Sequence, residues 1–428
     1  MQRQLIIPGL SLAVLIVSLV SPAVAGDWIG FRGGEHHGVA SAEGLPVTWS
    51  DNENILWKHE LPGLGSSSPI VVGDRLVVTC YSGYAESIDE PGEMDNLRRH
   101  IVCLDKTSGK VFWTKTIDPV LPESRYSSGN DSKHGYASST PTSDGERLYV
   151  QFGKTGVYCF DLDGTRRWQT DVGSGTNGWG SAASPLLVGD LLIVNASVES
   201  DSLIGLDKRT GQEIWRTKDI KKCWGSPVLV HTQEGHEVVL NLPRKLAAFD
   251  PTTGEELWHC GGIPDDYVCP SPIVHEDIVY AIGGRKNTAI AVRTGGRGDV
   301  NESHVLWRAN NGSNVSSPVF VDGHLFWLHE SRGIAYCLDA ASGELKYEER
   351  LSPQPGLIYS SVTAANGKLY ALSQENGAYV LATNPNKMEQ LAVNTFESDT
   401  SRCNASVAIV DNLLYLRNDK AIYCLGHN

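Results

Sequence analysis

Short apolar runs and polar turns alternate along this chain in an order that returns many times. The clearest copy opens at Ser68 and a proline, runs through apolar residues to a turn at Gly73, and continues in a second apolar run. A third run ends in Asp105, and a Ser-Gly turn leads to a fourth run that contains Trp113. Apolar runs of this length, bounded by Gly, Asp and Ser, predict four short β-strands joined by tight turns.

The same order recurs along the rest of the chain. The further copies run from Thr140 to Trp168, Ser184 to Trp215, Ser226 to Trp258, Ser271 to Trp307, Ser317 to Tyr347, Ser361 to Leu391 and Ser406 to Leu425. A repeat of about 40–50 residues that contains four short strands is typical of propeller blades. The sequence therefore predicts an all-β fold, an eight-bladed β-propeller of four-stranded antiparallel blades.

The final copy holds only three predicted strands, residues 407–410, 413–416 and 421–425, before the sequence ends at Asn428. A lone strand that includes a Trp, residues 54–58, precedes the first copy. We expect the N-terminal strand to complete the last blade, because this closure leaves no open sheet edge within the ring.

Composition agrees with a single repetitive domain. The 428 residues include 44 Gly and only 3 Met, which suits many strands joined by tight turns rather than helices. The formal net charge of −14 argues against nucleic acid as a partner, since phosphate binding requires a cationic surface.

The first 25 residues have the features of a signal peptide. A positive start at Arg3 precedes an apolar stretch, residues 10–20, and an Ala-Val-Ala sequence ends at Ala25. We expect cleavage near Ala25 and one mature propeller domain, residues 26–428, that is exported to the periplasm or the extracellular space. No later segment is long and apolar enough for a transmembrane span.

The nine cysteines divide into positions of the repeat. Cys103, Cys159, Cys337 and Cys424 occupy one third-strand position, where other copies have Gly205 and Ala248. We expect this position to need a small buried side chain. Cys223, Cys269 and Cys403 precede first strands, near the predicted channel. Cys260 and Cys269 are close enough in sequence to form a disulfide, and two free thiols are the alternative.

Repeated Trp and Asp residues are expected to be structural. Trp113, Trp168, Trp215, Trp258 and Trp307 recur at one outer-strand position, which predicts packing between neighbouring sheets. Asp105, Asp161, Asp207, Asp250 and Asp339 stand before turns, where a carboxylate accepts backbone N–H groups.

The repeated Leu-Asp-x-x-Thr/Ser-Gly-x-x-x-Trp resembles the tryptophan-docking repeat of the pyrroloquinoline quinone (PQQ) family of propellers. Segments 27–33, 44–50, 134–141 and 179–185 are similar to exported PQQ-like repeat proteins of planctomycete-type bacteria. The resemblance covers nearly the whole mature chain. Its superfamily includes quinoprotein alcohol and glucose dehydrogenases and the non-catalytic outer-membrane assembly lipoprotein BamB, so it implies a fold that serves several functions.

The resemblance also implies what a quinoprotein dehydrogenase would need: an adjacent Cys-Cys pair, a Trp beneath the cofactor, calcium ligands and a catalytic Asp. No two cysteines are adjacent here, and no haem-binding Cys-x-x-Cys-His occurs. No residue matches the calcium-ligand motif. PQQ and calcium are thus possible cofactors with an incomplete motif.

Other catalytic motifs are also missing from the sequence. His236-Glu237 lacks a second His at metalloprotease spacing, and His36-His37 lies in an N-terminal loop. No Gly-x-Ser-x-Gly or phosphate-binding loop occurs. Catalytic residues are unknown at this point, and no metal site is predicted.

Two insertions interrupt the repeat, residues 81–100 and 118–136, and both are expected near one mouth of the channel. Residues of these insertions and of other inter-blade loops could line that mouth and bind a small polar ligand or a peptide. The candidates are Arg125, Asn130, Lys133, His134, Asn177, Trp179, Trp224, Tyr267, Asn314, Tyr359, Arg402 and Asn404.

These observations favour a non-catalytic binding or scaffold module of the cell envelope, with a protein partner or a small polar ligand such as a glycan. The first alternative is a PQQ-dependent dehydrogenase that oxidises alcohols or sugars. The second is a glycan-binding module that uses Trp179, Trp224 and Tyr359. Affinity capture, dye-linked oxidation and polysaccharide binding respectively distinguish the three hypotheses.

Overall fold

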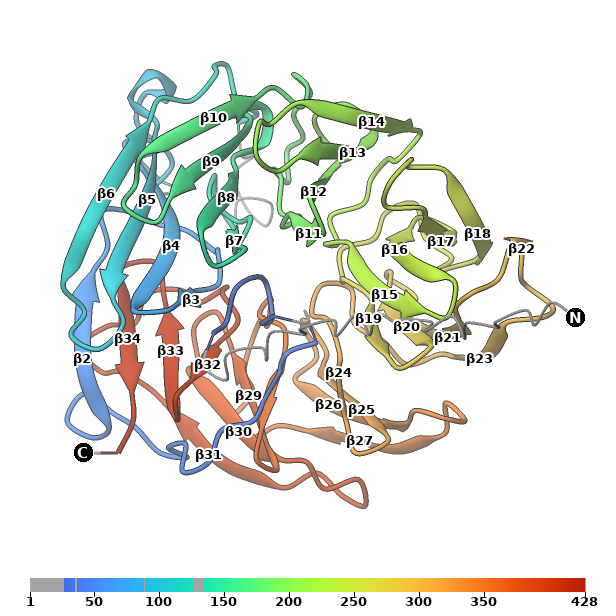
Figure 1. Cartoon of the computed structure of the whole chain (residues 1–428). Coiled ribbons are helices and arrows are strands. Elements are labelled where there is room, and N and C mark those ends of the chain that lie inside the picture. Colours follow the sequence, from blue (N-terminus) through green and yellow to red (C-terminus); the bar gives the residue numbers. More distant parts are fainter. Residues whose placement is uncertain (1–26, 35–36, 88, 126–133, 428) are drawn as a thin grey trace, which may run out of the picture.

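The computed structural model describes residues 27–34, 37–87, 89–125 and 134–427. The predicted leader therefore lies outside the described residues. Eight sheets stand around a central channel (Figure 1), which confirms the predicted eight-bladed propeller. Each blade is built from four antiparallel strands, and helix is limited to the two short 3-10 turns Met94–Asn96 and Gly153–Thr155 among the described residues.

The strands of each blade follow one another from the channel outward. The first four blades are β3 (Ile70–Val72), β4 (Arg75–Ser82), β5 (Arg98–Asp105) and β6 (Val111–Ile117); β7 (Thr142–Ser143), β8 (Arg147–Gln151), β9 (Val157–Asp161) and β10 (Arg166–Thr170); β11 (Leu186–Val188), β12 (Leu191–Ala196), β13 (Ser202–Asp207) and β14 (Glu213–Lys218); and β15 (Val228–Thr232), β16 (Gly235–Leu242), β17 (Lys245–Phe249) and β18 (Glu256–Gly261).

The second half of the ring repeats this arrangement. Its blades are β19 (Ile273–His275), β20 (Ile278–Gly283), β21 (Thr288–Arg293) and β23 (Val305–Ala309); β24 (Val319–Val321), β25 (His324–Leu328), β26 (Ile334–Asp339) and β27 (Leu345–Arg350); β28 (Thr363–Ala365), β29 (Lys368–Leu372), β30 (Ala378–Ala382) and β31 (Gln390–Asn394); and β32 (Ala408–Val410), β33 (Leu413–Arg417), β34 (Ala421–Leu425) and β2 (Ile55–Glu60). Two short additions, β1 (Val39–Ala40) and β22 (Gly298–Asp299), pair with β28 and β18.

The last blade joins the two ends of the chain, as predicted. Strand β2 pairs antiparallel with β34, and Trp57 stands opposite Cys424. In Figure 1 the blue β2 lies beside the red β34. The ring is therefore closed by main-chain hydrogen bonds between segments far apart in the sequence.

A second closure runs around the channel through the residue that opens each repeat. The backbone N–H of each of these residues donates to the side-chain hydroxyl of the equivalent residue in the next blade, at 2.8–3.1 Å. The order is Ser68, Thr140, Ser184, Ser226, Ser271, Ser317, Ser361, Ser406 and back to Ser68. All eight side chains are buried, so the circle satisfies groups that water does not reach.

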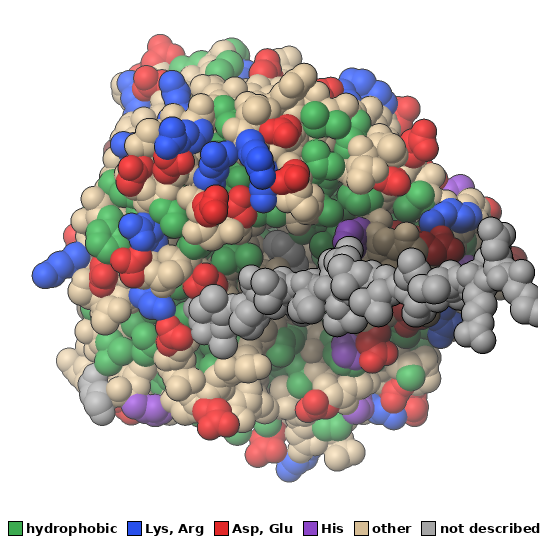
Figure 2. Space-filling view, viewed as in Figure 1, with side chains coloured by type: hydrophobic (Ala, Val, Ile, Leu, Met, Phe, Trp, Pro, Cys, Tyr) green, Lys and Arg blue, Asp and Glu red, His purple; other side chains and the backbone are tan. Residues whose placement is uncertain are grey.

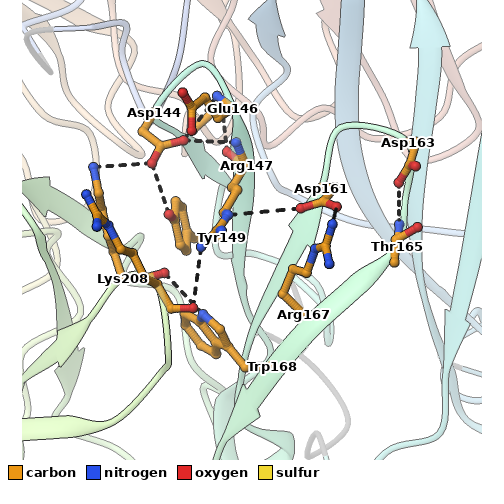
Figure 3. A network of polar contacts seen from close by, with 12 residues as sticks. Asp144, Glu146, Arg147, Tyr149, Asp161, Asp163, Thr165, Arg167, Trp168 and Lys208 are labelled. Atoms are coloured by element: carbon orange, nitrogen blue, oxygen red, sulfur yellow. Dashed lines mark hydrogen bonds and ion pairs between the residues drawn. The ribbon is translucent and has the colours of Figure 1, made fainter.

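The repeated Trp residues link neighbouring blades, as predicted. The indole Nε1 of Trp57, Trp113, Trp168, Trp215 and Trp307 donates to a backbone carbonyl in the next blade at 2.9–3.1 Å. Figure 3 shows Trp168 in this contact with Lys208. The turn glycine of that blade lies against the indole: a Cβ on Gly211 would stand 2.6 Å from Trp168.

The contact between the Trp indole and the next blade also explains why the third strand has a small residue at this position. Cys103, Cys159, Gly205, Ala248 and Cys424 stand directly across the sheet from Trp113, Trp168, Trp215, Trp258 and Trp57. A Cβ on Gly205 would lie 2.3 Å from the ring of Trp215. A larger side chain would push the indole out of its contact with the next blade.

Four of the five turn aspartates accept backbone N–H groups as predicted: Asp105, Asp207, Asp250 and Asp339. Asp161 differs, because its carboxylate pairs with Arg167 and lies 4.0 Å from Arg147. In that turn the Asp163 carboxylate accepts a hydrogen bond from the backbone N–H of Thr165 instead (Figure 3).

One blade has a covering segment that the sequence pattern did not predict. The turn between β21 and β23 is extended, and its strand β22 pairs in parallel with β18 beside Trp258. Trp258 is fully buried and donates to the Glu237 carboxylate at 2.7 Å rather than to a backbone carbonyl. Arg297 from the extended turn pairs with the same carboxylate at 3.2 Å, so this blade replaces the common contact with a buried charged one.

We predict that Trp57→Ala destabilises the whole propeller, because it removes an inter-blade contact at the point where the ring closes. Substitution of a fully buried Trp by Ala lowers the free energy of unfolding by about 3–5 kcal/mol. Because Trp57 is half-buried, we expect a loss of about 2–4 kcal/mol. Urea unfolding measures the difference. Leu56→Ala is the matched control, since Leu56 is 41% exposed on the same strand; equal effects of the two substitutions would contradict the role of Trp57.

Candidate functional site

Strand direction places all inter-blade loops at one mouth of the channel. Each inner strand begins two residues after a residue of the hydroxyl ring, and the outer strand before it ends at the same side. The turns between second and third strands also lie there. The turns between first and second strands lie at the other mouth, so the two faces of the ring are built from different loops.

The described parts of the two predicted insertions lie on the inter-blade side and contact each other. Arg99 and Glu123 form a buried ion pair at 2.6 Å, and Arg98 pairs with Asp118 at 3.2 Å. Arg99 also donates to the carbonyls of Tyr136 and Phe152. A buried charge that is paired and hydrogen-bonded on several sides holds its loops in one arrangement.

An N-terminal segment crosses the channel. Trp28 exchanges two backbone hydrogen bonds with Val71 of β3, and the carbonyl of Ile29 accepts from Ser143 of β7. Arg32 then donates across the ring to the carbonyls of Pro318 and Val362 at 2.5 and 3.2 Å. Figure 1 shows this dark-blue segment in the middle of the ring. The segment therefore links blades on different sides of the channel.

The channel contains a recess of about 290 Å³ at the inter-blade mouth. Phe31 of the N-terminal segment contributes to it, as do four members of the hydroxyl ring. Its lining consists of Phe31, Ser66, His134, Ser138, Trp179, Ala182, Trp224, Ser226, Tyr267, Cys269, Ser271, Asn314, Val315, Ser317, Tyr359, Ser361 and Asn404.

Three aromatic rings from successive inter-blade loops form one wall. The ring centroid of Trp179 lies 5.2 Å from that of Trp224 and 4.7 Å from that of Tyr267. Trp224 donates its indole N–H to the Gly180 carbonyl at 2.8 Å, and Tyr267 accepts from Asn314 at 2.8 Å. Trp224 and Tyr267 are buried and held by these bonds, whereas Trp179 is half-buried and keeps part of its ring open.

The polar groups of the lining are neutral at physiological pH. Burial lowers the pKa of His134 to about 4, and its Nδ1 is 2.6 Å from the Ser138 hydroxyl. Burial also raises the pKa of Cys269 to about 12, so this residue is a thiol and not a nucleophilic thiolate. Asn404 accepts from Gln374 at 2.6 Å.

The structure brings most of the candidate residues together. His134, Trp179, Trp224, Tyr267, Asn314, Tyr359 and Asn404 line the recess. Asn177 lies in a neighbouring small cavity beside Arg99, Arg402 pairs with Asp419 at 3.0 Å, and Arg125 is exposed. Asn130 and Lys133 lie outside the described residues. The sequence reasoning missed Phe31, because the segment around it has no strand periodicity.

All nine cysteines are free, so the Cys260–Cys269 disulfide does not form. Cys269 faces the recess, while Cys223 is buried and donates to the Asn241 carbonyl at 3.1 Å. The third-strand cysteines are buried at the predicted small position.

Comparison with known proteins identifies the family. A family model described as outer membrane protein assembly factor BamB matches residues 97–349 and 201–425, which together cover most of the chain. The chain belongs to this family. A relative named outer membrane protein assembly factor BamB, from Burkholderia pseudomallei (strain K96243), is 21% identical over 375 residues, which cover 74% of this chain and 84% of the relative.

Solved structures share the propeller of this BamB family. BamB from Moraxella catarrhalis has a TM-score of 0.58 at 14% identity, over 87% of this chain and 97% of that chain. The quinohemoprotein alcohol dehydrogenase ADHIIG from Pseudomonas putida HK5 also has a TM-score of 0.58, at 11% identity, over 94% and 80% of the two chains. At these identities the likeness shows the fold alone.

The described recess does not fit the PQQ and calcium of the dehydrogenases that share this fold. PQQ is a tricarboxylate, and a buried carboxylate needs a cation or several donors. The described lining has no Lys or Arg, and no Asp or Glu to bind calcium. Among the described residues, no three His, Cys, Asp or Glu side chains lie close enough to hold a metal ion.

Within the described part of the chain, no helix is both long and apolar enough to cross a membrane.

Figure 2 shows acidic and basic side chains interspersed over the visible face.

A buried carboxyl stands behind the mouth. Glu199, in the turn after β12, is 4% exposed and accepts a hydrogen bond from the Ser181 hydroxyl, next to Ala182 of the recess. Burial raises the pKa of Glu199 from 4.5 to about 7. The folded state therefore holds this proton more tightly than the unfolded chain does, and ionisation at higher pH destabilises the fold.

We predict that Glu199→Gln raises the free energy of unfolding, relative to wild type, more at pH 8 than at pH 4.5. The cost of the buried charge is absent below pH 4.5, grows as pH rises, and is complete above pH 7. A shift of this size corresponds to a change of up to about 3 kcal/mol in the difference between variant and wild type. Urea unfolding across this range measures it. Glu255→Gln, at an exposed turn, is the control; a Glu199→Gln difference that does not vary with pH would contradict the assignment.

Proposed function

We propose that this protein is a non-catalytic binding propeller of the cell envelope that scaffolds a protein partner at its inter-blade mouth. The observation that carries the proposal is the recess at this mouth: inter-blade loops from every blade contribute to it, its described lining carries no charged side chain, and Phe31 of the N-terminal segment lies in it. Family membership agrees with this role, since the related proteins are named for assembly of outer membrane proteins.

The mouth is suited to docking because its loops are braced before a partner arrives. The Arg99–Glu123 pair fixes two insertions, and Trp224 and Tyr267 are held by hydrogen bonds to neighbouring loops. A surface that needs little ordering loses little conformational entropy on binding. Exposed residues such as Asn177, Lys222 and Asn310 surround the recess at the ends of different blades and would contact the partner first.

The expected leader, residues 1–25, and the printed name of the family support an envelope location. The free, buried thiols are compatible with export because most are enclosed within blades. The alternative of a PQQ-dependent dehydrogenase has no support in the described lining, where neither the carboxylates of the cofactor nor calcium finds partners.

We predict that a photo-crosslinking amino acid at Asn177, Lys222 or Asn310 captures the same envelope protein in the native cells. A partner that covers the mouth must touch several of these loops at once. Adducts are measured by affinity purification after a cleaved leader has been verified, and they are identified by mass spectrometry.

The control positions are Asp190 and Glu276, which lie in exposed turns between first and second strands, at the other mouth. They should give no such adduct. Equal capture from both faces, or no common adduct at the inter-blade positions, would contradict a partner docked at the mouth.

A further inference from the structure

The recess itself has a chemistry that differs from that of the loops around it. Its described lining contains aromatic rings, amides, hydroxyls and a neutral imidazole, but no charged side chain. Arg285 lies over the Tyr267 ring at 5.3 Å, Arg402 pairs with Asp419, and the buried Arg32 donates to the Pro318 and Val362 carbonyls, so these three cations are already in contact with the protein. A charged ligand would lose its hydration without gaining a counter-charge.

A purely apolar ligand fits no better. The half-buried hydroxyls of Ser66 and Ser138 would lose their access to water without gaining hydrogen bonds, and an unmet buried polar group is costly. The side-chain oxygen of Asn314 is buried without a hydrogen-bond partner among the described residues, so this side chain would have to turn toward the recess to accept from a ligand. The ligand should therefore carry both apolar faces and hydroxyl donors.

An extended peptide is disfavoured by the hydroxyl ring. The lining residues precede the inner strands, and the N–H groups of the ring residues already donate to neighbouring hydroxyls. The recess thus lacks the row of open backbone donors to which a peptide strand would add. Phe31 lines the recess and its segment crosses the channel, so we expect an end group rather than a continuing chain to enter.

We propose that the recess binds an uncharged saccharide end group. The half-buried ring of Trp179 offers flat apolar surface to a sugar ring, and Ser66, Ser138 and Asn314 line the recess with groups that can hydrogen-bond its hydroxyls. The volume of about 290 Å³ lies at the lower end of small-ligand sites, about 300–1,000 Å³, which suits a short saccharide end. This inference rests on the proposed binding role of the mouth and assigns its recess a ligand separate from the protein partner.

The test titrates purified mature protein with neutral sugars, namely glucose, N-acetylglucosamine, maltotriose and chitotriose, by calorimetry and saturation-transfer NMR. The charged comparators are glucuronic acid, glucosamine, and PQQ with calcium. We expect saturable binding of at least one neutral sugar with a Kd of about 1 mM or tighter, and at least tenfold weaker binding of its charged counterparts. Failure of every neutral sugar to bind folded protein, or tighter binding of a charged comparator, overturns the proposal.

Variants locate the site. Trp179→Ala should weaken binding at least tenfold, Trp179→Phe should retain most of it, and Ala182→Arg should block the recess without removing an aromatic ring. Phe112→Ala is the matched control, because Phe112 is an aromatic residue 47% exposed on the outer strand β6. Binding that survives both Trp179→Ala and Ala182→Arg, or an uncharged peptide that competes more strongly than any sugar, overturns the saccharide assignment.

The two proposals fail independently. Loss of sugar binding with intact crosslinks at Asn177 and Lys222 would remove the saccharide and keep the scaffold. Sugar binding that depends on Trp179, without any common crosslinked partner, would remove the scaffold and keep the saccharide.

Discussion

The closed circle of hydroxyl hydrogen bonds around the channel is the constraint on which the rest of the structure depends. Each blade offers one N–H and accepts at one hydroxyl, so every blade must stand at the same distance from its neighbours. The proline that follows most of these residues has no N–H left to satisfy in the channel. Ser406 of the last blade donates to Ser68 of the first, and β2 completes that last blade by pairing with β34. The hydroxyl circle and the strand pairing therefore close the ring at the same place, next to the mouth.

The outer contacts enforce the same spacing from the other side of each sheet. An indole at the outer strand reaches a carbonyl of the next blade, and a glycine there lets the ring approach. The small residue opposite each indole keeps it at that depth. Inner hydrogen bonds around the whole ring, and outer indoles at five of the junctions between blades, therefore hold the blades at two radii, which leaves the inter-blade loops free to vary. That freedom explains how one loop can supply His134, another Trp179 and another Asn314 to a single recess.

Much of this could be predicted from the sequence, because strands, turns and docking residues are local patterns that recur. The last blade was predictable for the same reason: residues 54–58 carry the Trp of a fourth strand. Features that do not repeat along the chain could not be predicted. The segment around Phe31 has no strand pattern, and its position depends on contacts with Val71, Ser143 and Pro318 from distant blades. Most residues that line the recess could be predicted from their position in the inter-blade loops. The ion pair of Arg402 with Asp419 could not, because spacing along the chain does not reveal it.

The most direct test of this account is native-state hydrogen exchange of the ring amides. Because the circle forms as one unit, the amides of Ser68, Ser226 and Ser406 should exchange with similar free energies, close to that of global unfolding. Much faster exchange at Ser68 and Ser406 than at Ser226 would contradict the account. It would mean that the closing blade opens alone and that the mouth is not held by a complete ring.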